Sequence, residues 1–198
     1  MRTDFLLVRH GQVEAAWRDR IYGCLDVPLS DQGRAEARRA ARFLAAEPLD
    51  AVLSSGLSRA RYGAAWLARE HRLEVRHDAA LREINRGEWA GLSFDDLEAR
   101  HPGALAAWRE APWTTQPPGG ESMSDLAARV CPVLDDLARE FVGGQVGIVA
   151  HSHVLRAALA RFEGERASMQ RDVPTGSIFA LDWTADGPVN LRWSEIFG

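Results

Sequence analysis

Apolar runs alternate along this chain with longer stretches in which apolar residues recur every three to four positions. The runs cover residues 4–9, 49–55 and 73–76, and the longer stretches cover 31–47 and 57–71. Short apolar runs predict buried strands, and the helical period predicts amphipathic helices. Strands that alternate with helices are typical of a parallel sheet with helices on its faces. The first part of the chain therefore predicts a β-α-β-α-β unit.

The second half of the chain predicts longer elements of the same kinds. We expect a helix from about residue 122 to 141, a buried strand over 145–150 and a helix over about 153–162. Two further strands are expected around 177–183 and 189–196. Together these elements predict an α/β fold, a three-layer α/β/α sandwich with a mostly parallel sheet.

The helix expected over 122–141 carries a single apolar stripe. Its members are Leu126, Val130, Val133, Leu134, Leu137 and Phe141. A stripe of this kind faces a protein core. Pro132 interrupts the helix, and we expect a kink there because proline removes a backbone donor and crowds the preceding turn.

Residues 87–121 break the alternation of strands and helices. This segment is rich in proline, glycine and tryptophan. We expect it to form a lid-like excursion over one face of the sheet, within a single domain that spans residues 1–198. Its tryptophans Trp89, Trp108 and Trp113 are expected to pack in the core or in the excursion.

Composition restricts the class of protein. With 198 residues and 46% hydrophobic residues, the chain can fill a core without disulfides or structural metals. Cys24 and Cys131 lack the spacing of a zinc site, so we expect free thiols in a cytoplasmic protein. No apolar stretch approaches a membrane span, and a net charge of −4 disfavours nucleic acids and anionic membranes as partners.

Charged residues and histidines gather where predicted strands end. Arg9 and His10 follow the first strand, Arg59 comes soon after the second, Glu83 lies beyond the third, and His151 follows the strand 145–150. The carboxyl ends of parallel strands meet at the edge where ligands bind. Arginines and histidines at that edge predict a pocket for a compact dianion such as phosphate.

Two of these residues add reactivity to the predicted pocket. A neutral imidazole is a competent nucleophile near pH 7, so His10 is a candidate to form a phosphoryl intermediate. Glu83 is a candidate to protonate the departing alkoxide, which requires a raised pKa from burial or from an adjacent phosphate dianion. Glu88 is the rival acid in the same segment.

Five motifs occur in order along the chain. They are "VRHG" at 8–11, "LSSGLSRA" at 53–60, "LREINRGEWAG" at 81–91, "PPGGES" at 117–122 and "VAHSHVLRAAL" at 149–159. Their order and content resemble the histidine phosphatase superfamily, also called phosphoglycerate-mutase-like. The resemblance implies a phosphomonoesterase that acts on a small phosphorylated metabolite without cofactor or metal.

The resemblance also implies roles for individual residues. It implies that His10 is the phosphorylated histidine, that Glu83 is the proton donor, and that the phosphate is bound by three residues: Arg9, Arg59 and His151. The residues that it places in substrate binding are Gln12, Tyr22, Gly23, Cys24 and Ser152.

Three positions depart from the pattern of the family. It usually has an acidic residue at the position of Gln12, an asparagine at Ala16 and Gly-Gly at Ser152-His153. The alanine removes an amide that contacts phosphate, and His153 either crowds the pocket or adds a donor to it. The proposed nucleophile, acid and arginines are unaffected by these departures.

Several functional alternatives stay open. The runs "IYGCLDVPL" and "PPGGES" look most like the α-ribazole phosphatase and broad-specificity phosphatase branch, which implies α-ribazole phosphate or a sugar phosphate as substrate. The alternatives are a phosphoglycerate-mutase-type phosphotransferase, which the family suggests would be longer, and a noncatalytic phosphate-binding relative. The "HSH" at 151–153 raises a metal-dependent hydrolase, although further ligands are not evident. A homodimer also stays open.

Overall fold

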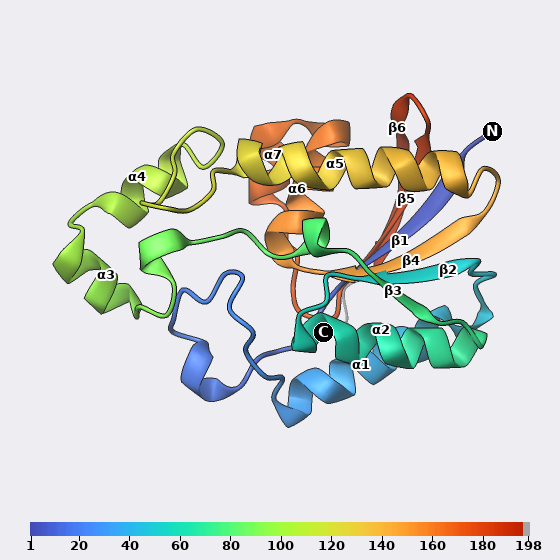
Figure 1. Ribbon diagram of the computed structural model, residues 1–198, viewed down its shortest axis with the longest axis horizontal. Coiled ribbons are helices and arrows are strands. Elements are labelled where there is room, and N and C mark those ends of the chain that lie inside the picture. The colour runs from blue at the N-terminus through green and yellow to red at the C-terminus, as the bar shows by residue number, and fades with distance from the viewer. Residues whose placement is uncertain (196–198) are drawn as a thin grey trace.

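A computed structural model, which describes residues 1–195, contains a six-stranded sheet in the order β3-β2-β4-β1-β5-β6 (Figure 1). The strands are β1 Thr3–Arg9, β2 Ala51–Ser54, β3 Val75–His77, β4 Gln145–Ala150, β5 Ile178–Thr184 and β6 Gly187–Glu195. β1, β2, β3 and β4 are mutually parallel, whereas β5 runs antiparallel to both β1 and β6. The prediction of a mostly parallel sheet is confirmed. Residue 196, the end of the last expected strand, lies outside the described residues.

Helices cover both faces of this sheet (Figure 1). They are α1 Asp31–Phe43, α2 Ser58–His71, α3 Phe94–Arg100, α4 Ala104–Glu110, α5 Met123–Glu140, α6 Ser152–Glu163 and α7 Glu165–Gln170, with short 3₁₀ segments η1 Ala15–Trp17, η2 Leu44–Ala46, η3 Ala79–Leu81 and η4 Gly87–Trp89. α1 and α2 lie against one face, and α5 and α6 lie against the other. The three-layer prediction is confirmed, while the short helices α3, α4 and α7 were not predicted.

The alternation of side chains along β1 explains the two helical layers. Successive side chains of a strand point to opposite faces of the sheet. Phe5 and Leu7 join the core on the α5 and α6 side, whereas Leu6 and Val8 join the core on the α1 and α2 side. Residues 5–8 of β1 are all apolar, and they are therefore buried on both faces, as is typical of a parallel sheet.

The long helix α5 begins with a capping box. The Ser122 side chain accepts a hydrogen bond from the Asp125 backbone N–H, and the Asp125 carboxylate accepts one from the Ser122 backbone N–H. The expected stripe is buried at Leu126, Val130, Leu134 and Leu137, with Val133 and Phe141 half-buried against the same core. α5 runs through Pro132 as one continuous helix.

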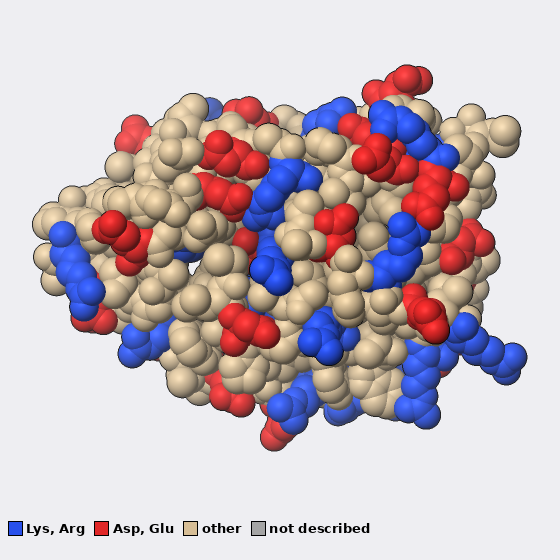
Figure 2. Space-filling view, in the orientation of Figure 1, with Lys and Arg blue, Asp and Glu red and all other residues tan. Residues whose placement is uncertain are grey.

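The segment between η3 and α5 extends the molecule beyond the carboxyl ends of the strands. Figure 1 shows α3 and α4 to the left of the sheet, away from its amino ends. Acidic and basic side chains are interspersed over the face shown in Figure 2. None of the helices described for residues 1–195 combines the length and apolar character needed to cross a bilayer.

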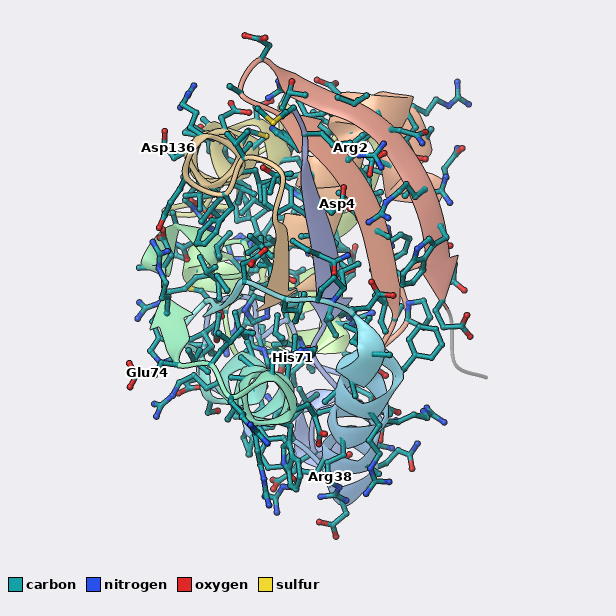
Figure 3. The ribbon with its side chains drawn as sticks, turned by 90° about the vertical axis from the view of Figure 1, so that its right-hand side faces the viewer. Arg2, Asp4, Arg38, His71, Glu74 and Asp136 are labelled. Carbon is teal, nitrogen blue, oxygen red and sulfur yellow. The ribbon has the colours of Figure 1, made fainter. Side chains whose placement is uncertain are left out.

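An ion-pair network joins β1, β5 and β6 near the amino end of β1, where Figure 3 shows Arg2 and Asp4 close together. Asp182, only 1% exposed, lies 2.7 Å from Arg192 Nε and 3.0 Å from Arg2 Nη1. Asp4 contacts the same two arginines. Burial and the neighbouring Asp4 raise the pKa of Asp182, and the arginines oppose that rise. The network therefore ties strands together at the end of the sheet opposite the site described next.

Candidate active site

Three adjacent strands of the sheet end at one place. β1 lies next to β4, and β4 lies next to β2. Arg9 and His10 follow β1, Ser55 follows β2, and His151 follows β4 as the N-cap of α6. The parallel arrangement of these strands thus brings together residues that lie far apart in the chain, at the edge where α/β proteins bind ligands.

Gly11 allows the turn after His10 to approach helix α1 very closely. A Cβ atom at Gly11 would lie 2.0 Å from the carbonyl oxygen of Gly33, a distance that no side chain tolerates. The neighbouring backbone N–H of Gln12 donates to the carboxylate of Glu36 on α1. The glycine of the "VRHG" motif is therefore required by backbone packing beside the histidine.

His10 is 2% exposed and has a defined orientation. Its Nδ1 lies 2.7 Å from the Gly11 carbonyl oxygen, which can only accept, so Nδ1 carries the ring proton. Nε2 is left with its lone pair, and the Nε–H of Arg59 points at it from 3.3 Å. Burial, with smaller effects from His151, Arg59 and Arg9, holds the pKa of His10 well below its usual value. His10 is therefore neutral, with a nucleophilic Nε2.

The fully buried Arg59 is anchored by backbone carbonyls of a loop distant in sequence. Its Nη1 donates to Leu25 at 2.6 Å, and its Nη2 donates to Gly23 at 2.7 Å. The guanidinium also lies over the Tyr22 ring, 5.2 Å from its centroid. Burial lowers the pKa of Arg59 from its very high ordinary value, whereas Glu83 raises it. These contacts hold a cation beside His10.

Two further polar groups complete the anion side of the site. His151 Nε2 lies 2.7 Å from the Ser55 hydroxyl, and His151 Nδ1 has no partner within residues 1–195. Burial, followed by the charge of Arg59, lowers the pKa of His151 to about 3. Arg9 donates through Nη1 to the Val173 carbonyl, while its buried Nε is also without a partner in this part of the chain. The Ser55 hydroxyl can donate to Nε2, which leaves the ring proton of His151 on Nδ1, so this position and Arg9 Nε both suit a bound anion.

Glu83 is 6% exposed and accepts hydrogen bonds on both carboxylate oxygens. The Ile84 backbone N–H donates to Oε1 at 2.9 Å. On the other oxygen, His153 Nδ1 lies 3.2 Å and the His153 backbone N–H 3.4 Å from Oε2. The rival candidate Glu88 is exposed, whereas Glu83 is buried and lines the pocket described below.

The raised pKa expected for Glu83 is not found in this structure. Burial alone raises the pKa of the carboxyl, but His153, His151 and the Ile84 N–H together hold it well below its ordinary value. Hydrogen-bond donors and the nearby guanidinium groups of Arg59 and Arg86 favour the ionised form. The sequence allowed that His153 adds a donor to the pocket, but it did not pair His153 with Glu83, 70 residues away.

A pocket of about 260 Å³ opens beside this cluster. Figure 2 shows a hollow between the α3–α4 segment and the rest of the molecule. Arg9 and Glu83 line the pocket at its inner end. Its other walls are formed by Arg20, Ile21, Tyr22, Gly23, Ile84, Arg86, Trp89, Phe94, Leu105, Trp108, Arg109, Ser152 and His153. The excursion over 87–121 thus supplies one wall of the pocket.

Some of the residues expected in substrate binding line the pocket, and others do not. Tyr22, Gly23 and Ser152 line the pocket. Gly23 has a φ of +43°, and a Cβ there would lie 2.6 Å from the Ile84 carbonyl oxygen. The side chain of Gln12 instead accepts from Arg18 at 2.6 Å, and Cys24 donates to Asn85 at 3.7 Å. Neither Gln12 nor Cys24 is among the pocket residues.

The two histidines of the "HSH" sequence do not converge. His151 bonds Ser55, whereas His153 bonds Glu83 and Arg86. Among the residues described, no three His, Cys, Asp or Glu side chains are arranged to hold a metal ion.

Sequence reasoning missed a second cluster that lines the pocket. Arg86, 8% exposed, lies 3.0 Å from His153 Nε2 and 4.0 Å above the ring centroid of Trp108. It has no hydrogen bond to a carboxylate among residues 1–195, although the charge of Glu83 acts on it and favours its charged form. Burial lowers the pKa of Arg86 to about 10. The available signals were Arg86 within the "LREINRGEW" motif and His153 as a departure from the family pattern.

Comparison with known proteins gives consistent matches over nearly the whole chain. The family model of the histidine phosphatase superfamily (branch 1) matches residues 5–196. Glucosyl-3-phosphoglycerate phosphatase of Mycobacterium tuberculosis (strain ATCC 25618 / H37Rv) is 38% identical, over 98% of this chain and 84% of that protein. A 2,3-bisphosphoglycerate-dependent phosphoglycerate mutase of Azorhizobium caulinodans is 35% identical, over 94% of this chain and 95% of its own length.

Solved structures agree with these matches. The mycobacterial glucosyl-3-phosphoglycerate phosphatase superposes with a TM-score of 0.86 at 32% identity, covering 95% of each chain. The α-ribazole phosphatase from Shigella flexneri superposes with a TM-score of 0.84 at 26% identity, covering 96% of this chain and 94% of that one. The fold is therefore shared with phosphatases.

Proposed function

The chain belongs to the histidine phosphatase superfamily (branch 1), and on this premise we propose that it hydrolyses phosphate monoesters through a phosphohistidine on His10. The observation that carries the proposal is the neutral His10, whose Nδ1 is held by the Gly11 carbonyl and whose Nε2 faces the Arg59 guanidinium. A nucleophile beside a fixed cation is suited to attack on a phosphoryl group.

The first chemical step transfers the phosphoryl group to the enzyme. Nε2 of His10 forms a bond to phosphorus as the bond from phosphorus to the leaving oxygen breaks, and Glu83 gives that oxygen a proton. Arg9, Arg59 and the unpartnered Nδ1 of His151 bind the phosphoryl oxygens. The bound dianion raises the pKa of Glu83 by like-charge repulsion, which opposes the donors that hold it ionised in the empty site.

The second step releases phosphate. Water attacks the phosphorus of the phosphohistidine while the ionised Glu83 accepts a proton from that water, and the bond from phosphorus to Nε2 breaks. The products are inorganic phosphate, neutral His10 and protonated Glu83, which is ready for the next turnover. The same carboxyl group acts as acid and then as base, so its position beside the leaving oxygen serves both steps.

The pocket favours a leaving group that carries a second anion. The buried guanidinium of Arg86 has no carboxylate hydrogen-bonded to it among residues 1–195, the charge of Glu83 compensates it only through space, and Arg20 and Arg109 line the same pocket. Burial of a cation is costly unless an anion compensates it. The relatives are named for phosphoglycerate, glucosyl-3-phosphoglycerate and phosphoserine, which are phosphate esters of hydroxy acids. These observations support a carboxylate-bearing alkyl phosphate over α-ribazole phosphate.

A matched pair of substrates tests this specificity. 3-Phosphoglycerate and glycerol 3-phosphate differ in having a carboxylate or a hydroxymethyl group at the far end. We expect the wild type to prefer 3-phosphoglycerate, and Arg86→Met to lower kcat/KM for it about 10- to 100-fold more than for glycerol 3-phosphate. Equal losses on both would reject the carboxylate assignment. Phosphate release from α-ribazole phosphate, sugar phosphates, phosphoserine and glucosyl-3-phosphoglycerate completes the panel.

A mutase is the second candidate function. Chain length was expected to favour hydrolysis, but a phosphoglycerate mutase is matched over 95% of its own length, so length does not separate the two activities. Phosphorus NMR of 3-phosphoglycerate incubated with enzyme and catalytic 2,3-bisphosphoglycerate distinguishes them. We expect inorganic phosphate to accumulate, whereas a mutase would form 2-phosphoglycerate faster than phosphate.

The family also bears on the domain organisation, the location and the metal independence of the enzyme. We propose that residues 1–198 form one domain whose 87–121 segment acts as a lid-like wall over the leaving group. A cytoplasmic location suits the free thiols Cys24 and Cys131, which are both unpaired in the structure.

Phosphatase assays with and without EDTA test the metal-independent mechanism, because loss of activity on chelation would indicate a metal-dependent hydrolase.

A further inference from the structure

His153 bonds both Glu83 and Arg86. Its Nδ1 lies 3.2 Å from Glu83 Oε2, and its Nε2 lies 3.0 Å from Arg86 Nη2. The ring also meets the Trp108 indole edge to face, with 5.7 Å between ring centroids. Arg86 in turn lies over the same indole. The imidazole is therefore held on three sides, next to the carboxyl group that serves as acid.

The contacts of His153 determine its protonation. A guanidinium can only donate hydrogen bonds, so the Nε2 that faces Arg86 must be the acceptor. A neutral imidazole with an acceptor at Nε2 carries its proton on Nδ1, and that N–H points at Glu83 Oε2. Burial lowers the pKa of His153, although Glu83 opposes this, and the neutral ring agrees with that direction. His153 therefore acts as a hydrogen-bond donor to an ionised Glu83.

We propose that His153 is a positioning residue that orients Glu83 for proton transfer to the leaving-group oxygen, with Arg86 fixing the ring that does so. The inference rests on the proposed function, since it assumes that Glu83 is the proton donor. His153 itself needs no contact with substrate or with the phosphoryl group. Its effect passes through one hydrogen bond to Oε2.

This arrangement depends on the side chain at position 153. With glycine there, Oε2 of Glu83 would keep only the 3.4 Å contact to the backbone N–H of that residue. Loss of the ring would also leave Arg86 without its imidazole acceptor. The carboxyl would then rotate more freely, and a general acid loses rate when it is displaced from the oxygen that it protonates.

Removal of the donor also changes the pH dependence of the reaction. A hydrogen bond to the ionised form lowers a carboxyl pKa, so its removal raises the pKa of Glu83. Glu83 must be protonated to act as the acid. The rate therefore falls at high pH as Glu83 ionises, and this fall is the alkaline limb of the pH–rate profile. We expect loss of the His153 donor to move this alkaline limb upward by about one pH unit.

Other charged or titratable groups around Glu83 stay in place in these variants. They are Arg59 on α2, Arg86 three residues after Glu83, Arg129 on α5, whose Nη2 donates to the Glu83 carbonyl oxygen, His151 at the N-cap of α6 and Arg156 within α6. His151 and Arg59 influence the limb in wild type and variants alike. A difference in the position of the alkaline limb between the wild type and a variant therefore reports the loss of the Nδ1–H donor.

Two polar substitutions of His153 distinguish the effect of its hydrogen bond to Glu83 from the effect of removing the ring. In His153→Asn the amide N–H₂ occupies nearly the place of Nδ1 and keeps the donor to Glu83. In His153→Gln the amide extends toward the place of Nε2, which keeps a contact to Arg86 and loses the donor. His77→Gln, at an exposed histidine on β3, is the control for replacement of a histidine.

The experiment measures single-turnover phosphorylation against pH for each variant. The substrates are p-nitrophenyl phosphate and whichever of 3-phosphoglycerate and glycerol 3-phosphate is hydrolysed faster. For the alkyl phosphate, we expect His153→Gln to lower the rate about tenfold with little change in KM and to shift the alkaline limb upward. His153→Asn should keep the wild-type limb. Rates with p-nitrophenyl phosphate, whose leaving group needs little protonation, should stay within about twofold of wild type.

The outcomes of this experiment are distinguishable. An unchanged alkaline limb in His153→Gln, or an equal shift in Asn and Gln variants, overturns the positioning role. Equal losses on both substrates indicate a structural role and overturn it as well. If the rate loss in Glu83→Gln does not depend on the leaving group, Glu83 is not the proton donor and the proposed function is wrong on this point. If Glu83→Gln behaves as expected while His153→Gln retains the limb, only this inference fails.

Discussion

The Nε–H of Arg59 lies 3.3 Å from Nε2 of His10, in line with the lone pair that attacks phosphorus. The nucleophile and the cation that binds the phosphoryl group thus face each other directly. A phosphoryl group that enters the site replaces this contact, because its phosphorus bonds Nε2 and its oxygens accept from the guanidinium. Four predictions follow from the positions of His10, Arg59, Glu83 and His151.

The first prediction concerns the nucleophile. His10→Ala should abolish turnover and the acid-labile phosphoenzyme, because it removes the lone pair of Nε2 that attacks phosphorus. The fold should persist, as judged by circular dichroism, since the Gly11 and Gly33 backbones still pack together. Rapid-quench labelling measures the intermediate, and label retained on the His10→Ala protein would contradict the assignment.

The second prediction concerns Arg59. Its replacement by alanine should lower kcat/KM about 10²-fold, near 3 kcal/mol, as for loss of one oxyanion donor. Lysine should restore activity only in part, because an ammonium cannot hold Leu25, Gly23 and the phosphoryl oxygens together. Steady-state kinetics and vanadate inhibition measure both effects. Wild-type inhibition by vanadate in Arg59→Ala would show that the anion binds elsewhere.

The third prediction concerns Glu83 and depends on the leaving group. Glu83→Gln should slow phosphoryl transfer from alkyl phosphates roughly 10²- to 10⁴-fold, because an alkoxide needs a proton to leave. p-Nitrophenyl phosphate should be affected much less, and the alkaline limb for the alkyl substrate should vanish. Pre-steady-state rates are required so that phosphorylation is the observed step. Equal losses on both substrates would mean that Glu83 shapes the pocket only.

The fourth prediction concerns stability against pH. The folded pKa of His151 is about 3, below its value of about 6.5 in the unfolded chain. Between these values the unfolded state binds the proton and the folded state does not, so stability falls as the pH is lowered. His151 should contribute a slope of about 1.4 kcal/mol per pH unit.

Urea denaturation between about pH 6 and pH 4 measures this slope. His151→Asn should have a shallower fall in the free energy of unfolding than the wild type, because the variant lacks the proton-binding group. Parallel curves for the two proteins would show that His151 is protonated in the folded state, in conflict with its burial beside Arg59.

Much of this protein follows from its sequence alone. The strands and main helices were predicted because their periodicity is a local property, and residues 5–8 read as a strand buried on both faces. The five motifs identified the family, and the rule that parallel strands end together brought Arg9, His10 and His151 to one edge. The short helices α3, α4 and α7 were missed because tertiary contacts, more than local pattern, stabilise helices of this length.

Only the tertiary structure determined the protonation of Glu83 and the contacts of Arg86 in the pocket wall. Glu83 was expected to have a raised pKa, but packing of α6 against the segment after β3 places the Nδ1–H of His153 on its carboxylate. The same packing sets Arg86 on His153 and over Trp108, across separations of 67 and 22 residues. No local pattern encodes contacts of that kind, because they depend on how distant elements pack, whereas strands and motifs are determined by residues close together in the chain.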